Sequence, residues 1–338
     1  MNRVPLLRMT HAGPYCELGG FHIDPCQAVA RAVITHAHAD HVTRGCRSYL
    51  TARSGVELLR SRLNTNAVIQ PLEYGAGLEL AGVKVSLHPA GHILGSSQVR
   101  IEHCGEVWVV TGDYKTTPDP TCTPFEPVRC HTLITESTFG NPTFVWPDPA
   151  SVVDAIHAWW RGNQARGVAS LLYAYALGKA QRVLHALDPQ VGPIGLQRDV
   201  RSNCGFYEQE GVIFPPTFDP NATENGTHWQ RGLYIAPPSA RWRQPFPFHG
   251  HYATAFVSGW MLLPGGAEQR RVDTGFALSD HAGYDEIHAT IAACEAERVG
   301  VMHGYIDGLV AELQAAGRDA FSFRSPRCGP TPKLQASP

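Results

Sequence analysis

The chain has 338 residues, of which 43% are hydrophobic and 17% charged, and its formal net charge at pH 7 is −2. A chain of this length can bury a substantial core, in one large domain or in two modest ones. The charge balance excludes a protein that is basic throughout, so any contact with nucleic acid must rest on a local basic patch.

Two features of the sequence concern the compartment. No apolar run approaches the roughly 20 residues that a transmembrane helix needs, and the first residues, MNRVPLLRMTHAG, lack the features of a signal peptide. The nine cysteines are an odd number without a C-x-x-C pair, which favours reduced thiols over a disulfide framework. We therefore expect a soluble, cytoplasmic protein that does not enter a membrane.

Short apolar segments alternate with amphipathic ones, which predicts an α/β fold. Strands are expected at 32–35, 83–88, 98–102, 107–111, 132–135, 171–175, 233–236, 255–258 and 299–302. Helices are expected at 54–63, 152–161, 179–187, 284–294 and 307–316. Residues 211–250 are rich in Pro, Gly, Asn and aromatic residues and are expected to form loops around one strand.

The first expected strand runs into the segment ITHAHADHV, which contains His36, His38, Asp40 and His41. Side chains alternate along a strand, so His36 and His38 point the same way, while Asp40 and His41 continue onto the loop and can serve a second ion. A buried core would have to find a partner for each imidazole nitrogen, and a solvated loop has no need of this composition. The segment therefore predicts metal binding.

Three further candidate ligands, His92, Asp113 and His303, lie in PAGHILGSS, WVVTGDY and VGVMHGY, on a glycine-flanked loop or at the end of an apolar strand. Taken alone, each histidine is more typical of a structural or surface residue; beside the first motif, it becomes a candidate ligand. Imidazoles and carboxylates without thiolates suit two divalent ions, most naturally Zn²⁺, with Mn²⁺ or iron as alternatives. Such a pair predicts hydrolysis at phosphorus or at carbonyl carbon.

The order and settings of these residues resemble the metallo-β-lactamase fold superfamily. The resemblance implies a four-layer αββα sandwich. It implies one ion held by His36, His38 and His92, a second held by Asp40, His41 and His303, and Asp113 as the bridge between them.

The sequence between Asp113 and His303 is far longer than one βα crossover requires, so an inserted domain is expected there. TESTFG with Glu136 and LSDHAGYDE with His281 resemble the first and second motifs of the β-CASP nucleases, and His303 lies in the third. The resemblance implies a metallo-β-lactamase domain at 1–139 and 273–338 and an inserted α/β β-CASP cap domain at 140–272. It also implies that His281 assists the leaving oxygen of the scissile phosphate and that Glu136 orients His281. The alternative for Glu136 is a helix-capping or surface carboxylate.

The segment LLYAYALGKAQRVLHAL predicts a strand, a turn at Gly178 and a helix that starts near Lys179. Backbone amides at a helix start, with Lys179 and Arg182 close by, form a candidate phosphate site. The same pattern also describes any strand-to-helix turn with a solvated basic face. Lys115, two residues after Asp113, is a comparable candidate for substrate binding.

Over most of residues 20–305 the chain resembles the bacterial ligase-associated DNA exonuclease family, also described as mRNA 3′-end processing factor-like proteins. The segments that carry this resemblance include FHIDP, AVITHAHADH, PAGHILGSSQVRIE, ITESTFGNP, AYALGKAQR, GFALSDHA and VMHGY. The resemblance implies a two-metal phosphodiesterase that degrades DNA in repair, with a metal-bridging hydroxide as the nucleophile and Asp40 as a ligand that accepts a proton. It also implies DNA ligase and helicase partners.

Two alternative functions remain open from the residues. A histidine in the third motif is typical of RNA-processing members, which favours an RNA 3′-end processing nuclease. A small-molecule metallo-hydrolase would use the same ligands without needing the inserted domain, and a non-catalytic binding module would hold negligible metal.

Overall fold

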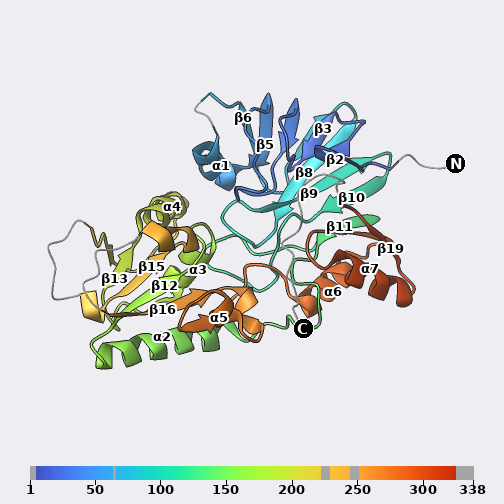
Figure 1. The fold of residues 1–338 in the computed structure, drawn as a ribbon. Helices are drawn as coiled ribbons and strands as arrows, with labels where there is room; N and C mark the ends of the chain where they lie inside the picture. The colour runs from blue at the N-terminus through green and yellow to red at the C-terminus, as the bar shows by residue number, and fades with distance from the viewer. Residues whose placement is uncertain (1–4, 64–65, 222–228, 244–250, 325–338) are drawn as a thin grey trace. The chain divides into compact units, whose positions relative to one another are not determined.

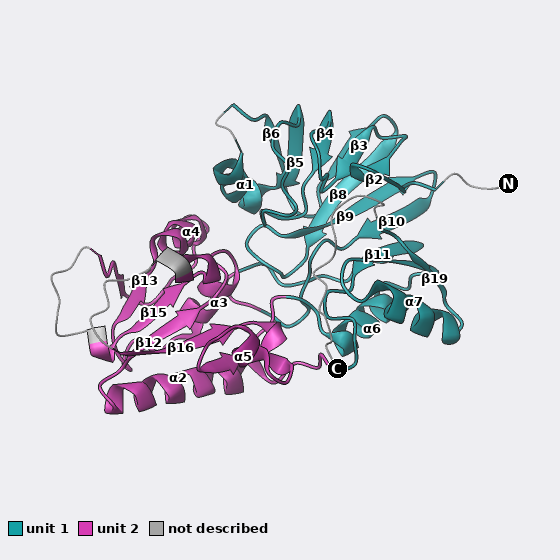
Figure 2. Cartoon of the chain, viewed as in Figure 1, with its two compact units in different colours: residues 1–118, 122–142, 281–338 teal, residues 119–121, 143–280 magenta. Residues whose placement is uncertain are grey.

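The structure is a computed structural model that describes residues 5–63, 66–221, 229–243 and 251–324 (Figure 1). The chain divides into two compact units, residues 1–118, 122–142 and 281–338 in the first and residues 119–121 and 143–280 in the second (Figure 2). The second unit thus continues to residue 280, whereas the predicted insertion spans 140–272.

Two sheets form the first unit. The six-stranded sheet has the order β1 (Arg8–Thr10), β2 (Gly13–Cys16), β3 (Phe21–Ile23), β4 (Arg31–Val33), β5 (Ser48–Ala52), β6 (Ile69–Leu72). The seven-stranded sheet has the order β19 (Asp319–Ser322), β18 (Arg298–Met302), β11 (Thr132–Glu136), β10 (Glu106–Val110), β9 (Ser97–His103), β8 (Val83–Pro89), β7 (Gly77–Leu80).

Apolar side chains from both sheets pack into one core between them, to which Phe21 and Val33 contribute from one sheet and Val85 and Ile134 from the other. On the outer face of the seven-stranded sheet, Val109 and Leu133 pack against α6 (Tyr284–Ala293) and α7 (Ile306–Ala315). On the outer face of the other sheet, Ile34 packs against α1 (Val56–Arg62). Helices therefore cover the outside of a pair of sheets, which gives four layers.

The strand directions bring several loops to one edge of the seven-stranded sheet. β10 runs parallel to β11, which runs parallel to β18, and β8 has the same direction because β9 is antiparallel to both β8 and β10. The carboxyl ends of β8, β10, β11 and β18 therefore meet at a single edge. The segments that follow them carry the candidate residues His92, Asp113 and His303, and β11 ends at Glu136.

The second unit has a six-stranded sheet in which every pairing is parallel. Its order is β14 (Thr217–Phe218), β13 (Ile194–Leu196), β15 (Leu233–Ala236), β12 (Ala169–Tyr173), β16 (Tyr252–Val257), β17 (Thr274–Phe276). The helices α2 (Pro149–Ala165), α3 (Lys179–Ala186) and α4 (Arg198–Gln209) pack their apolar side chains against it. The alternation of strand and helix along the chain explains the parallel pairing. Shorter helical segments are η1 (Arg53–Gly55), η2 (Trp229–Arg231), η3 (Pro238–Arg243), η4 (Gly259–Leu262) and α5 (Gly266–Gln269).

The predicted α/β class is confirmed. In the expected loop region 211–250, the single predicted strand is β15, and the structure adds the short β14, while residues 222–228 and 244–250 lie outside the described part. None of the described helices has the length and apolar composition that a membrane span needs. Cys26 is disulfide-bonded, which departs from the expectation of reduced thiols. Free cysteines in the described part of the chain are Cys16, Cys46, Cys104, Cys122, Cys130, Cys204 and Cys294.

Candidate metal centre and the His281–Glu136 pair

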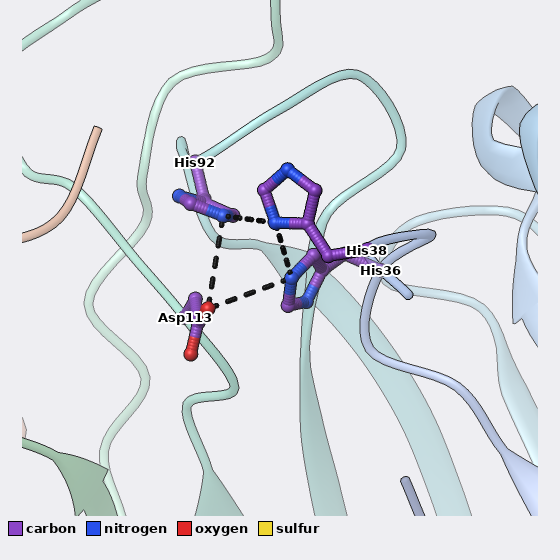
Figure 3. Close-up of side chains that lie close together, drawn as sticks. All are labelled: His36, His38, His92 and Asp113. Atoms are coloured by element: carbon purple, nitrogen blue, oxygen red, sulfur yellow. Dashed lines mark hydrogen bonds and ion pairs between the residues drawn. The ribbon is translucent and has the colours of Figure 1, made fainter. Parts of the chain in front are cut away.

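Three histidines and an aspartate converge in the first unit (Figure 3). His36 and His38 follow β4, His92 follows β8 and Asp113 follows β10. The Nδ1 atom of His38 lies 3.0 Å from Nε2 of His36 and 3.1 Å from Nε2 of His92. The Oδ2 atom of Asp113 lies 3.5 Å from Nε2 of His36 and 3.8 Å from Nε2 of His92.

These separations fit the ligand shell of a small divalent ion. With zinc–nitrogen distances of about 2.0–2.1 Å, neighbouring ligand atoms of a tetrahedral ion lie about 3.3 Å apart. The donor atoms of His36, His38, His92 and Asp113 also lie within 4.8 Å of one another. The residues present therefore fit the ion that the sequence predicted for them.

Asp24, which follows β3, is a residue of this centre that the sequence analysis did not select. It accepts hydrogen bonds from Nδ1 of His41 at 2.8 Å and from the hydroxyl of Thr35. Since the Thr35 hydroxyl donates to Asp24, it accepts from Nδ1 of His36, 3.1 Å away, and this leaves Nε2 of His36 with its lone pair. Asp24 thus fixes how both rings present themselves to an ion. The signals in the sequence were an aspartate after an apolar strand, which is equally typical of a turn, and its place in FHIDP, one of the segments that carry the family resemblance.

The charges in the centre favour a cation. Burial alone would lower the pKa of His41, but the carboxylates of Asp113 and Asp24 outweigh it and raise this pKa well above its ordinary value. Burial and the neighbouring His41 hold the pKa of His36 well below its ordinary value. Burial would raise the pKa of Asp113, but His41 and His281 lower it well below its usual range. Asp113 is therefore ionised and His36 neutral, the forms in which these two groups bind metal ions, whereas His41 has to release a proton to bind one.

The second predicted ligand set is more spread out. Nε2 of His41 is 3.4 Å from Oδ2 of Asp113, so one carboxylate oxygen of Asp113 lies close to donors of both predicted sets. Oδ2 of Asp40 is 3.9 Å from Nε2 of His41, on a side chain that is 82% exposed. The rings of His41 and His303 lie 5.9 Å apart, centre to centre. Asp40 and His303 therefore lie beside His41, but only the first set is brought together closely.

His281 and Glu136 form a hydrogen-bonded pair at the same edge of the sheet. Nδ1 of His281 lies 2.9 Å and 3.1 Å from the two carboxylate oxygens of Glu136, which is buried. Glu136 also accepts hydrogen bonds from the backbone N–H of Tyr114 at 3.0 Å and from the hydroxyl of Thr138. Nδ1 of His281 is 4.0 Å from Oδ2 of Asp113, so the pair adjoins the metal centre.

The cationic side chains among the predicted substrate-binding residues do not form a solvated basic face. Lys115, Lys179 and Arg182 are all buried. The backbone N–H of Gly178 donates to the side chain of Gln181 at 2.8 Å. Lys179 and Arg182 bond to acceptors of their own chain, described below, so their role in phosphate binding stays a prediction.

The chain is similar in sequence to several known proteins, and an endoribonuclease is among them. No family model matches the chain. The chain is 32% identical, over 92% of its length, to a protein of Opitutus terrae named as a probable DNA ligase, of which it covers 30%. It is 26% identical, over 69% of its length, to a transcription termination factor of Thermococcus kodakarensis, of which it covers 43%. It is 29% identical, over 51% of its length, to an endoribonuclease of Neurospora crassa, of which it covers 22%.

The chain thus spans less than half the length of each of these curated relatives. Among solved structures, a protein of unknown function from Enterococcus faecalis superposes with a TM-score of 0.59 at 13% identity, over 86% of this chain and 78% of that one, which shows similarity of fold alone. The relatives include endoribonucleases, which supports the predicted resemblance to nucleases.

Proposed function

We propose that this chain is a two-metal-dependent phosphodiesterase that acts as a DNA exonuclease in DNA repair. The observation that carries the proposal is the His281–Glu136 pair beside the candidate metal centre, with the ring of His281 4.7 Å from that of His92, centre to centre. Phosphodiester hydrolysis expels an alkoxide, which benefits from a positioned proton donor. A histidine that is held by a carboxylate and adjoins the metal centre meets this need.

The proposed cofactors are two divalent ions, Zn²⁺ by the chemistry of the ligands and Mn²⁺ or iron as alternatives. One would be held by His36, His38, His92 and Asp113, and the other by Asp40, His41, His303 and Asp113. When bound, such ions activate water and offset the charge that develops on the phosphate.

The chain's own contribution is to hold and deliver a proton. Glu136 accepts the Nδ1–H of His281, which stabilises the protonated ring and fixes its orientation. Glu136 is itself fixed by Tyr114 and Thr138, so the pair cannot rotate freely. His281 then protonates the leaving oxygen through Nε2, the nitrogen that does not bond to Glu136.

The relative named as a probable DNA ligase supports DNA as the substrate and a DNA ligase as a partner. Nearly the whole of this chain is similar to a part of that protein, which is much longer. We propose that the part of that protein to which this chain is similar acts on the same DNA as the ligase, and that a separate DNA ligase cooperates with this chain in the same way. A helicase partner and a cytoplasmic location are proposed on the family resemblance.

RNA 3′-end processing is the second candidate function. It is favoured by His303 in the third motif and by the endoribonucleases among the relatives.

The test compares degradation of end-labelled single-stranded DNA and RNA of matched sequence by metal-reconstituted protein. Asp40→Ala should abolish cleavage, and Glu79→Ala, a change at another exposed acidic residue of the first unit, should leave it unchanged. DNA cleavage that Asp40→Ala loses supports the proposal, and comparison of 5′ with 3′ labels gives the polarity. Cleavage of RNA alone would favour the second candidate, and full activity of Asp40→Ala would refute both.

A further inference from the structure

Four charged side chains form a buried cluster in the second unit. Lys179 and Arg182, in the first turns of α3, are 3% and 8% exposed, and Asp119 and Asp280 are 4% and 6% exposed. Burying charged groups is costly unless each finds partners, so a cluster of four is expected only where the chain bonds them closely.

The two cations of α3 bond to three consecutive residues of one segment, 278–280. Nζ of Lys179 donates to the carbonyl oxygen of Leu278 at 2.7 Å and lies 2.9 Å from Oδ1 of Asp280. Nη1 of Arg182 donates to the carbonyl oxygen of Ser279 and lies 3.3 Å from the same Oδ1 of Asp280. Two backbone carbonyls and one carboxylate of this short segment are thus held by α3.

Asp119 completes the cluster. Its Oδ2 lies 3.5 Å from Nε of Arg182, and its Oδ1 accepts hydrogen bonds from the backbone N–H and the hydroxyl of Thr121, at 2.9 Å and 2.7 Å. The guanidinium of Arg182 is therefore bonded on two sides, by Asp119 and by the segment 278–280, which limits its rotation.

The residue that follows this segment is His281. On its other side, the backbone N–H of Ala282 donates to the carbonyl oxygen of Tyr114 at 2.6 Å, and Ala282 is buried. Both chain neighbours of His281 are thus fixed by hydrogen bonds, and its side chain is fixed by Glu136. A buried ionic cluster contributes little net stability, but it can specify one backbone position among several of similar energy.

We infer that Lys179, Arg182 and Asp280 are positioning residues for the proton donor His281, and that the two cations act on the segment 278–280 instead of on a phosphate of the substrate. The inference rests on the proposed function, because it needs a reaction in which His281 protonates a leaving oxygen. A displacement of about 1 Å at a catalytic group can lower a rate about 100-fold, so a loosened segment is expected to reduce the rate strongly.

The test uses two oligodeoxynucleotides that differ at one linkage, where the leaving oxygen is replaced by bridging sulfur. A thiolate leaves without a proton donor, because a thiol has a pKa of about 8.5, far below that of an alcohol. Loss of a general acid therefore slows cleavage of the oxygen linkage by a factor of about 10²–10⁴ and leaves the sulfur linkage much less affected. The ratio of the two rate constants reports on proton donation and is insensitive to a loss of folded protein.

The variants are His281→Ala as the reference, Lys179→Met and Asp280→Asn to break the cluster, and Ser170→Ala as the matched control. Ser170 accepts a buried hydrogen bond from Asn163 at 2.9 Å elsewhere in the second unit. We expect Lys179→Met and Asp280→Asn to lower the oxygen-to-sulfur ratio about 10-fold to 100-fold in the direction of His281→Ala, with KM unchanged, and Ser170→Ala to leave the ratio as it is. If Lys179→Met does not fold, Arg182→Lys, which keeps the charge but loses the forked donor, is measured in its place.

Equal loss on both linkages, a raised KM, or a ratio that does not move would overturn the inference, and the raised KM would indicate that the cations bind substrate. These results leave the proposed function intact as long as His281→Ala shows the linkage dependence. Wild-type protein that cleaves neither oligonucleotide would instead refute the proposed function and the inference with it.

Discussion

Asp24 accepts hydrogen bonds from two residues of the candidate metal centre, Thr35 and His41, and through Thr35 it also orients His36. Replacing it by asparagine puts an N–H₂ group where an acceptor is needed for at least one of them. We expect Asp24→Asn to lower the affinity for Zn²⁺ about 10-fold to 100-fold, as is typical when the partner of a metal-binding histidine is lost. Competition with a chromogenic chelator measures this, and Glu79→Gln is the control. An unchanged affinity would show that the two rings are oriented by other contacts.

Gly304, next to the predicted ligand His303, has no room for a side chain. Its φ is +66°, and a Cβ atom would lie 2.1 Å from the carbonyl oxygen of Ser137. His303 itself has a φ of 59°, which is unusual for a residue with a side chain, and its carbonyl oxygen accepts a hydrogen bond from the hydroxyl of Ser137. The segment after Glu136 therefore holds the His303 loop in this conformation.

We expect Gly304→Ala to destabilise the protein by roughly 1–3 kcal/mol, because it adds backbone strain and displaces Ser137. Gly308→Ala is the matched control, since a Cβ atom there meets nothing within 4 Å and the residue lies in α7. Alanine in a helix is favoured over glycine by about 0.5–1 kcal/mol, so the control should be stabilising. Urea denaturation of both variants gives the two free energies, and a Gly304→Ala variant as stable as wild type would contradict the clash.

At the scale of elements, β12 is an inner strand of the sheet in the second unit. It pairs with β15 on one side and β16 on the other, and Leu172 is fully buried among side chains of α2 and α3. We expect Leu172→Ala to destabilise the unit by about 2–5 kcal/mol through the lost contacts and the cavity left behind. Ile213→Ala, at an 84% exposed position, should change the free energy of unfolding by less than about 0.5 kcal/mol. Equal effects of the two changes in urea denaturation would contradict this packing.

The elements that the sequence predicted well are those with apolar runs and clear ends. The expected helix at 179–187 is α3, Lys179–Ala186, because the glycine turn before it and Pro189 shortly after it mark the boundaries. Two of the strands that lead to the metal centre, β10 and β18, contain the apolar runs VWVV and VGVM because their two faces pack against different cores. The α4 helix was missed because most of its residues are polar, although Val200, Cys204 and Tyr207 recur at the spacing of one helix face.

The site could be predicted where its residues are close in sequence, as in the segment from His36 to His41. The burial of Lys179 and Arg182 could not, because their partner Asp280 is distant along the chain and a cation near a helix start usually faces solvent. Asp24 was missed for a similar reason, since a single aspartate carries no spacing pattern and its partners are known only once the strands are paired.

At the scale of the whole molecule, the two units have separate cores, and the candidate metal ligands found within residues 5–63, 66–221, 229–243 and 251–324 all belong to the first unit. An ion that binds only the folded first unit stabilises that unit by mass action, by about 2.7 kcal/mol at a free concentration 100 times its dissociation constant. Removal of the ion should therefore affect the units unequally. Hydrogen exchange monitored by mass spectrometry resolves them, because peptides from β10 and β11 report on the first core and peptides from β12 and β15 on the second.

We expect a chelator to accelerate exchange of the most protected amides in β10 and β11 about 100-fold, the factor that corresponds to this free energy. Exchange in β12 and β15 should change little, because the described residues of their unit include no candidate ligand. Asp24→Asn, with its weaker affinity, should show a smaller response to the chelator in the first unit. Equal acceleration in both units would mean that they unfold as one cooperative body, and no acceleration in either would mean that the His36, His38, His92 and Asp113 cluster does not bind a stabilising ion.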